Sequence, residues 1–117
     1  MVEDDAAIAT MYRIRLELEG WPVEVCRNGR AGLEAAVADP PAVVVLDMMM
    51  PVLDGLGFLE GLRKSEPTRD LPVVVLSNSP GLNGRRRRVE QLGAAAWLTK
   101  SQTSPVDLVE LLRPYMG

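Results

Sequence analysis

Histidine is absent from the 117-residue sequence, and Cys26 is its single cysteine. The first absence excludes every site that depends on an imidazole ring, including a phosphohistidine formed within this chain. A lone cysteine cannot form an internal disulfide and has no zinc-ligand partners, which favours a reducing compartment. No apolar run approaches the roughly 20 residues of a membrane span, and no basic-then-apolar signal segment opens the sequence. These absences together predict a cytoplasmic protein with no membrane partner.

An excess of positive charge is also lacking, since the formal net charge is −3. Direct nucleic-acid binding is therefore not expected. The exception is the run of four arginines at Arg85–Arg88. It is read either as a solvated helix face or as a docking surface for an acidic partner, such as a downstream effector.

The order of apolar patterns predicts one α/β domain over residues 1–117. Two continuous aliphatic runs, Val43–Leu46 and Val73–Leu76, are typical of parallel strands covered on both faces, and a weaker run follows at Ala94–Leu98. Val23 and Val25 alternate with other residues, as in a more exposed strand near an edge. Helical spacing of apolar residues predicts helices over 6–19, 30–38, 56–64 and 85–92, and a last helix capped by Ser104. Strands that alternate with helices indicate a parallel sheet with helices on both faces.

A strand is expected before the first helix, yet only Met1 and Val2 precede the acids at 3–5. Two residues make no central strand. Either the sequence starts inside that strand, with Met1 an internal residue, or the strand is severely shortened. We favour the first interpretation.

Polar residues follow each predicted strand, at the end of a parallel α/β sheet where ligands bind. These residues are Glu3, Asp4, Asp5, Asp47, Ser77 and Lys100. Each has an ordinary explanation when taken alone: the three acids can cap a helix, Asp47 and Ser77 can form turns, and Lys100 can be solvated. Their joint occurrence at the carboxyl ends predicts that acids, a hydroxyl and an ammonium group meet in one crevice.

The chemistry of this set is that of phosphoryl transfer. Carboxylates placed close together repel one another unless a cation neutralises them, and oxygen ligands without histidine or cysteine favour Mg²⁺. A carboxylate beside Mg²⁺ can accept a phosphoryl group and form an aspartyl phosphate. Asp47 is the candidate acceptor, Lys100 a point charge for one phosphoryl oxygen, and the Ser77 hydroxyl a donor to another.

Four stretches carry a resemblance to a known family: VEDD at 2–5, VVVLDMMMPVLDG at 43–55, PVVVLS at 72–77 and GAAAWLTK at 93–100. In this order and spacing, the chain resembles the receiver domain of bacterial two-component response regulators over essentially its full length. The resemblance implies a doubly wound, five-stranded parallel sheet of order 2-1-3-4-5. It also implies that Asp47 accepts a phosphoryl group from a sensor histidine kinase or a phosphotransfer protein. The expected output is a change of conformation, and the chain is not expected to be a classical enzyme.

The resemblance further assigns roles to single residues. Magnesium would be held by Glu3, Asp4, Asp47 and the backbone carbonyl of Met49, whereas Asp5 is read mainly as a helix cap. Ser77 and Trp97 match the switch hydroxyl and the switch aromatic residue, and Lys100 matches the phosphate-binding lysine.

One departure from the family pattern lies beside this lysine. Ser101 stands where the family usually has a proline joined by a cis bond. Because a cis bond before a residue other than proline costs about 2.5–4 kcal/mol, the Lys100–Ser101 bond is expected to be trans, or cis under strain.

Two other functions stay open. A receiver-like interaction module that works without phosphate would fit the departure at Ser101 and the short first strand. A phosphatase of the haloacid dehalogenase type also uses an aspartate after a hydrophobic strand, but it needs a second acid where this chain has Met49. The sequence names neither the kinase nor the effector, and it leaves the oligomeric state open, a homodimer included.

Overall fold

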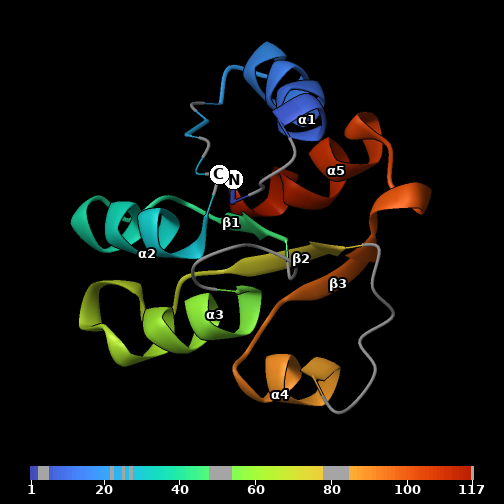
Figure 1. The fold of residues 1–117 in the computed structure, drawn as a ribbon. Coiled ribbons are helices and arrows are strands. Elements are labelled where there is room, and N and C mark those ends of the chain that lie inside the picture. The colour runs from blue at the N-terminus through green and yellow to red at the C-terminus, as the bar shows by residue number, and fades with distance from the viewer. Residues whose placement is uncertain are drawn as a thin grey trace.

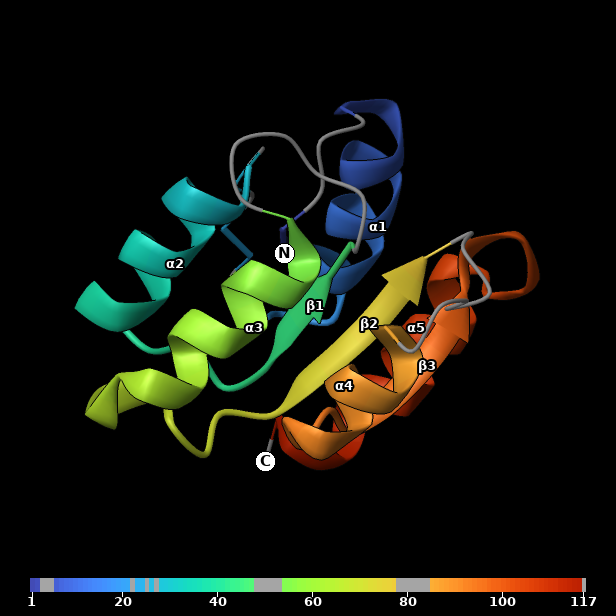
Figure 2. The same ribbon diagram turned by 60° about the horizontal axis from the view of Figure 1, so that its bottom comes forward.

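A computed structural model describes residues 1–2, 6–21, 23–24, 26, 28–47, 54–77 and 85–116. Within these residues three parallel strands form one sheet, in the order β1 (Val44–Leu46), β2 (Val73–Ser77) and β3 (Ala96–Thr99). Leu46 pairs with Val75, and Ser77 pairs with Thr99, so the three carboxyl ends lie at the same edge. Figure 2 shows the strands side by side and pointing in one direction.

Val2 lies beyond β1 and makes isolated parallel bridges with Leu46 on one side and Cys26 on the other. The two further strands of the predicted five-stranded sheet are therefore reduced, in the described residues, to single bridges. A longer ladder needs several paired residues on each segment, and here only Met1 and Val2 lie between the two flanking segments. Val23 and Glu24 belong to no strand, and Val25 lies outside the described residues.

Five α-helices connect the strands of the described chain: α1 (Ala6–Leu18), α2 (Gly29–Ala38), α3 (Gly55–Lys64), α4 (Arg85–Gln91) and α5 (Pro105–Leu112). Short 3₁₀ turns follow at η1 (Glu66–Thr68), η2 (Lys100–Gln102) and η3 (Arg113–Tyr115). All the predicted helices are present, and their ends differ from the predicted ends by no more than a residue or so. Glycines with positive φ, Gly20 at 83° and Gly93 at 80°, follow α1 and α4, a conformation that glycine adopts without steric cost.

Side chains cap three of these helices. Ser104 and Asp107 form the predicted cap of α5 as a reciprocal capping box, with both hydrogen bonds at 3.1 Å. Asn28 caps α2 and Asp54 caps α3, each by accepting a backbone N–H of the first turn.

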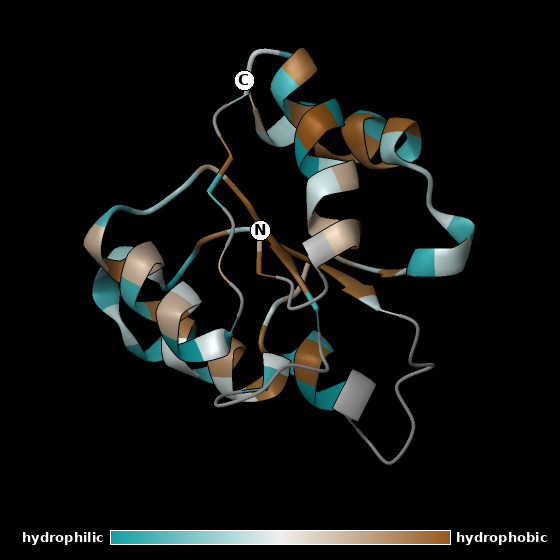
Figure 3. Ribbon diagram, turned by 45° about the horizontal axis from the view of Figure 1, so that its top comes forward, coloured by the Kyte–Doolittle hydropathy of each residue, from teal (hydrophilic) through white to brown (hydrophobic). Residues whose placement is uncertain are grey.

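The helices form a layer on each face of the sheet (Figure 1). On one face α1 and α5 cover a core cluster built on Val45, Val74 and Leu76. On the other face α2, α3 and α4 cover a cluster built on Leu46, Val73 and Val75. The strands are hydrophobic along their length, whereas the helices alternate hydrophobic and hydrophilic residues (Figure 3). None of the described helices is both long enough and apolar enough to cross a membrane.

Helix α1 buries one of its two apolar ridges. Tyr12 and Leu16 are 2% and 4% exposed, but Met11, Ile14 and Leu18 of the second ridge are 46%, 53% and 70% exposed. A helix at the surface of a sheet turns a single stripe toward the core, so only one ridge could be covered.

Candidate functional site

The site is assembled from the residues at the carboxyl ends of the three strands. Asp47 follows β1 directly, Ser77 is the last residue of β2, and Lys100 follows β3. Because Leu46 is level with Val75 and Thr99 with Ser77, the strand register brings all three residues to the same edge of the sheet. β1 and β2 are short and buried, so the first polar residue after the aliphatic run of each falls where the sheet ends.

Asp47 and Lys100 form an ion pair in which Nζ of the lysine donates to Oδ2 of the carboxylate at 3.1 Å. The Asp47 side chain is 5% exposed and the Lys100 side chain 11%. Burial of a lone carboxylate is costly, and a partner of opposite charge within hydrogen-bonding distance offsets that cost. The backbone N–H of Asp47 also donates to the carbonyl of Val2 at 3.0 Å. The acidic group is thus held by both its backbone and its side chain.

Lys100 reaches Asp47 from the 3₁₀ turn η2, and the Lys100–Ser101 bond is trans, since no described peptide bond is cis. The serine at position 101 therefore does not prevent the contact that the lysine makes with the carboxylate. Thr103 closes the turn by donating its N–H to the carbonyl of Lys100 at 3.4 Å.

Tyr12 of helix α1 is a positioning residue for the turn that carries Lys100. Its hydroxyl donates to the carbonyl of Thr103 at 2.6 Å, which ties helix α1 to the turn that carries Lys100. Tyr12 is almost fully buried, and a buried tyrosine hydroxyl needs a hydrogen-bond partner. That requirement was a usable signal, but the sequence does not say which of the buried carbonyls accepts the bond.

Ser77 and Trp97 lie on the same face of the sheet. Trp97 pairs with Val75, and Ser77 lies two residues beyond Val75, so side-chain alternation puts Ser77 on the face of Trp97. Ser77 is buried, and Trp97 is partly buried against the core cluster that includes Val89 of α4. Trp97 and Val89 of α4 therefore belong to one packed cluster.

The predicted metal ligands are only partly described. Glu3, Asp4 and Met49 lie outside the described residues, as does Asp5. Among the residues that are described, no group of three Asp, Glu, His or Cys side chains could hold a metal ion. Val2, the residue before Glu3 in the chain, accepts the hydrogen bond from the backbone of Asp47.

Helix α4 consists of Arg85–Gln91, and its arginines Arg87 and Arg88 are exposed. The helix packs against α3. The cationic run thus lies on the helix that shares a core cluster with Trp97.

Comparison with known proteins identifies the family. The sequence model of one protein family, the response regulator receiver domain, matches residues 1–113. The chain belongs to this family, as its sequence motifs predicted, and it is a receiver domain of two-component signalling. Such a domain is a phosphoacceptor signalling module and not a classical enzyme.

Curated relatives with similar sequences are longer proteins. The response regulator MprA of Mycolicibacterium vanbaalenii is 38% identical over 112 residues, which are 96% of this chain and 46% of the relative. The DNA-binding dual master transcriptional regulator RpaA of Synechocystis sp. is 33% identical over 112 residues, which are 96% of this chain and 44% of the relative. The chain thus spans less than half the length of these relatives, and the part they share with it is the receiver domain.

Solved structures share the fold closely. The receiver domain of the sensor histidine kinase PA1611 of Pseudomonas aeruginosa, with a magnesium ion coordinated in its active-site cleft, is similar with a TM-score of 0.86 and 26% identity; the match covers 99% of this chain and 93% of that one. The chemotaxis protein CheY4 of Vibrio cholerae is similar with a TM-score of 0.86 and 26% identity, covering 97% of this chain and 93% of that one.

Proposed function

We propose that this receiver domain is phosphorylated on Asp47 and that the aspartyl phosphate changes the conformation of the face that carries α4. The observation that carries the proposal is the buried pair between Asp47 and Lys100, with 3.1 Å between Nζ and Oδ2. A buried carboxylate held at the open edge of a parallel sheet, with a cation beside it, is suited to accept an anionic group.

The proposed reaction moves a phosphoryl group from a phosphohistidine of a sensor kinase or a phosphotransfer protein to this chain. A carboxylate oxygen of Asp47 forms a bond to phosphorus while the bond from phosphorus to the imidazole nitrogen breaks, and the imidazole keeps the electron pair and takes up a proton. The ammonium group of Lys100, which contacts the carboxylate of Asp47, would contact a phosphoryl oxygen after the transfer. Because the ammonium already lies beside Asp47, little reorganisation is needed when the charge arrives.

Magnesium fits the donor set of the site. The candidate ligands, Glu3, Asp4, Asp47 and the carbonyl of Met49, are all oxygen donors, which Mg²⁺ prefers. Bound there, the ion would neutralise the carboxylates and the phosphoryl oxygens. The hydrogen bond from Asp47 to Val2 supports the set, since Val2 immediately precedes Glu3 in the chain.

The proposed switch runs from Ser77 through Trp97 to α4. The hydroxyl of Ser77 would donate to a phosphoryl oxygen, and Trp97 on the same sheet face would repack as Ser77 moves. Helix α4 shares the core cluster of Trp97 through Val89, so the repacking would shift the helix that carries the exposed Arg87 and Arg88. An acidic effector surface is the partner that these arginines fit, and a cytoplasmic location follows from the proposed signalling role.

The test is phosphorylation by a small donor. The protein is incubated with Mg²⁺ and acetyl phosphate and analysed by intact-mass spectrometry, beside Asp47→Asn and the control Asp70→Asn, which alters an exposed acid. One added phosphoryl group is expected on the wild type and on Asp70→Asn, and none on Asp47→Asn. Hydroxylamine should remove the group, because it cleaves acyl phosphates.

Three results would contradict the proposal: no adduct on the wild type, an adduct on Asp47→Asn, or an adduct that resists hydroxylamine. The first would favour a receiver-like module that acts without phosphate. Sustained multiple turnover of a phosphate ester would instead indicate a phosphatase.

A further inference from the structure

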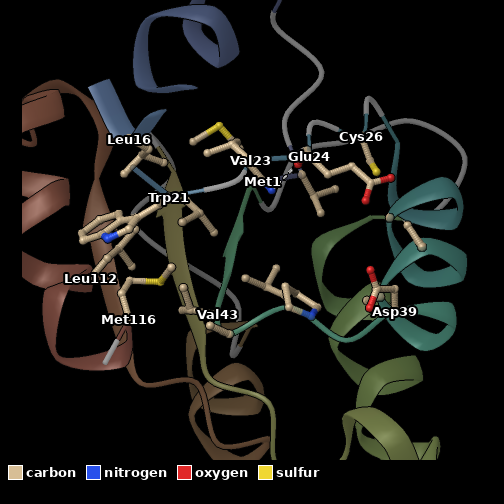
Figure 4. A pocket seen from close by; sticks show the side chains of 18 of the residues that line it. Met1, Leu16, Trp21, Val23, Glu24, Cys26, Asp39, Val43, Leu112 and Met116 are labelled. Atoms are coloured by element: carbon tan, nitrogen blue, oxygen red, sulfur yellow. Dashed lines mark hydrogen bonds between the residues drawn. The ribbon is translucent and has the colours of Figure 1, made fainter. Parts of the chain in front are cut away.

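Helix α1 exposes a ridge of three large apolar residues, Met11, Ile14 and Leu18. They are 46% to 70% exposed and follow one another at the spacing of a single helix face. The covered ridge of the same helix points inward, where Leu16 lines an internal cavity (Figure 4). Single apolar side chains at a surface are ordinary, but contiguous ones are typical of an interaction site. The exposed ridge is therefore a candidate surface for a partner.

Two ion pairs lie along the flanks of the exposed ridge. Arg13 and Glu17 form one pair, with 3.7 Å between Nε and Oε1, and Arg15 and Glu19 form the other, with 3.4 Å between Nη2 and Oε1. With 3.6 residues per turn, the two pairs lie on opposite sides of the ridge, each roughly a quarter of a turn away. In both pairs the arginine is nearer the start of the helix and the glutamate nearer its end.

This order of charges makes the face of α1 complementary to itself in one orientation. When two α1 helices pack antiparallel about a two-fold axis, each flank meets the same flank of the other copy with its direction reversed. Each arginine then lies near a glutamate of the other copy, on both flanks. In a parallel pair, arginines would meet arginines and glutamates would meet glutamates.

The apolar residues fit the same antiparallel register. With Ile14 packed against Leu18 of the other copy, each arginine is offset from its opposite glutamate by two residues, which is about 3 Å along the helix. Long arginine and glutamate side chains span such an offset. One register therefore joins the apolar ridges and pairs the charges on both flanks.

Helix α5 lies beside the exposed ridge and widens the surface. Arg113 of α5 donates to Oε2 of Glu19 at 3.4 Å, which fixes the side of α5 that faces α1. Val106 lies two helical turns before Arg113, on the same side, and is 52% exposed. Four large apolar side chains from each copy form a contact smaller than the about 1,200 Å² of stable complexes, so the association is expected to be weak.

We propose that the exposed ridge of α1 is a self-association surface, through which two copies of this chain form a weak antiparallel homodimer. A second copy is the occupant because it supplies apolar residues for the ridge and opposite charges for both flanks at once. Helix α1 covers the face of the sheet opposite to α4 (Figure 1). The dimer is therefore independent of the proposed phosphorylation of Asp47 and of the switch toward α4.

The first experiment measures self-association of the unphosphorylated chain by sedimentation velocity. A dilution series should show a dimer with a dissociation constant on the order of 100 µM. Ile14→Glu places a charge in the middle of the contact and should weaken the dimer at least about tenfold. The matched control is Leu111→Glu, which alters an apolar residue that is 43% exposed. Leu111 is two residues from Arg113 and so lies on the opposite side of α5, and this variant should associate like the wild type.

The second experiment reverses the charges of one flank. Arg13 and Glu17 are both about half exposed, so their replacement should leave the melting temperature of the fold nearly unchanged. Arg13→Glu and Glu17→Arg each bring like charges together across the antiparallel contact, and each should weaken self-association about tenfold. An equimolar mixture of the two variants should associate as the wild type does, because opposite charges then meet again. In a parallel dimer, Arg13→Glu would instead strengthen the association.

Three results would overturn the proposal. The first is a wild-type chain that stays monomeric throughout the dilution series. The second is a dimer that persists in Ile14→Glu and is lost in Leu111→Glu, because the contact would then lie on another surface. The third is a mixture of Arg13→Glu and Glu17→Arg that associates no better than either variant alone, since the antiparallel pairing requires that it does.

Discussion

Arg63 and Lys100 lie at opposite ends of the sheet and are used in opposite ways. Arg63, at the end of α3, donates to five backbone carbonyls, those of Leu92, Thr68, Arg69, Leu71 and Gly93, at 2.6 to 3.4 Å. Lys100, beyond β3, faces the buried carboxylate of Asp47. The first cation joins the loops that lead into β2 and β3. The second lies beside a carboxylate to which, in our proposal, a phosphoryl group is transferred.

The chemistry of the two groups explains the difference. A guanidinium ion has several donors in a fixed plane and can serve carbonyls from different loops at once, whereas an ammonium ion is a compact point charge on a flexible stem. Burial lowers the pKa of Arg63, but a guanidinium ion keeps its proton at any physiological pH. The contacts of Arg63 at the amino end of the sheet therefore join parts of the fold, whereas the carboxyl end holds the pair that we propose takes part in the reaction.

Replacing Arg63 should have the largest effect on stability. Arg63→Met leaves several partly buried carbonyls without their donor, and we expect a loss of about 3 kcal/mol in the free energy of unfolding. Urea denaturation measures it, with Arg30→Met on the exposed side of α2 as the control, which should change little. If the two variants unfold at the same urea concentration, the contacts of Arg63 do not stabilise the fold.

Replacing Lys100 should have its main effect on the rate of phosphorylation. Lys100→Met removes the charge beside Asp47, the proposed phosphoryl acceptor, and we expect the rate of phosphorylation by acetyl phosphate to fall about 100-fold. Lys64→Met, at the exposed end of α3, is the matched control and should be phosphorylated at the wild-type rate. A wild-type rate of phosphorylation in Lys100→Met would show that Lys100 does not assist the reaction.

Tyr12→Phe tests whether one hydrogen bond near the carboxyl ends of the strands contributes both to the stability of the fold and to the rate of phosphorylation. The change removes the hydrogen bond to the carbonyl of Thr103 and should cost about 1 kcal/mol of stability. Because the turn with Lys100 loses an anchor, phosphorylation should also slow, though less than in Lys100→Met. A stability loss with an unchanged phosphorylation rate would limit Tyr12 to packing.

The smallest expected effect concerns Cys26, which forms a single bridge with Val2. Burial, and next the negative charge of Glu24, raise the pKa of its thiol above 9.0, so less reactive thiolate exists at a given pH than in an exposed cysteine. Iodoacetamide should therefore modify Cys26 more slowly than free glutathione at pH values below about 9, and the rate should increase as the pH rises. Equal rates at pH 8 would show that the thiol is not shielded.

Several features could be read from single stretches of the chain. The aliphatic runs mark β1 and β2 because strands buried on both faces cannot alternate with polar residues. Gly20, Gly93 and Ser104 mark helix ends because each satisfies a local backbone requirement. The order of the motifs around Asp47 and Lys100 was specific enough to predict the family.

Other features could not be read in this way. The second ridge of α1 has the same apolar spacing as the first, and only the position of the sheet decides that Leu16 is covered and Leu18 is not. Arg63 and Tyr12 both donate to backbone carbonyls, which every residue carries. Their partners therefore depend on which loops the fold brings near them.

By itself, the sequence determined which residues could meet at the carboxyl edge, because strand ends and helix caps depend on neighbours a few positions apart. The tertiary structure decided that Lys100 reaches Asp47, 53 positions away, from a trans turn anchored by Tyr12. That outcome depends on how whole layers pack on the sheet, and the free energy of that packing is shared among residues that no local pattern connects.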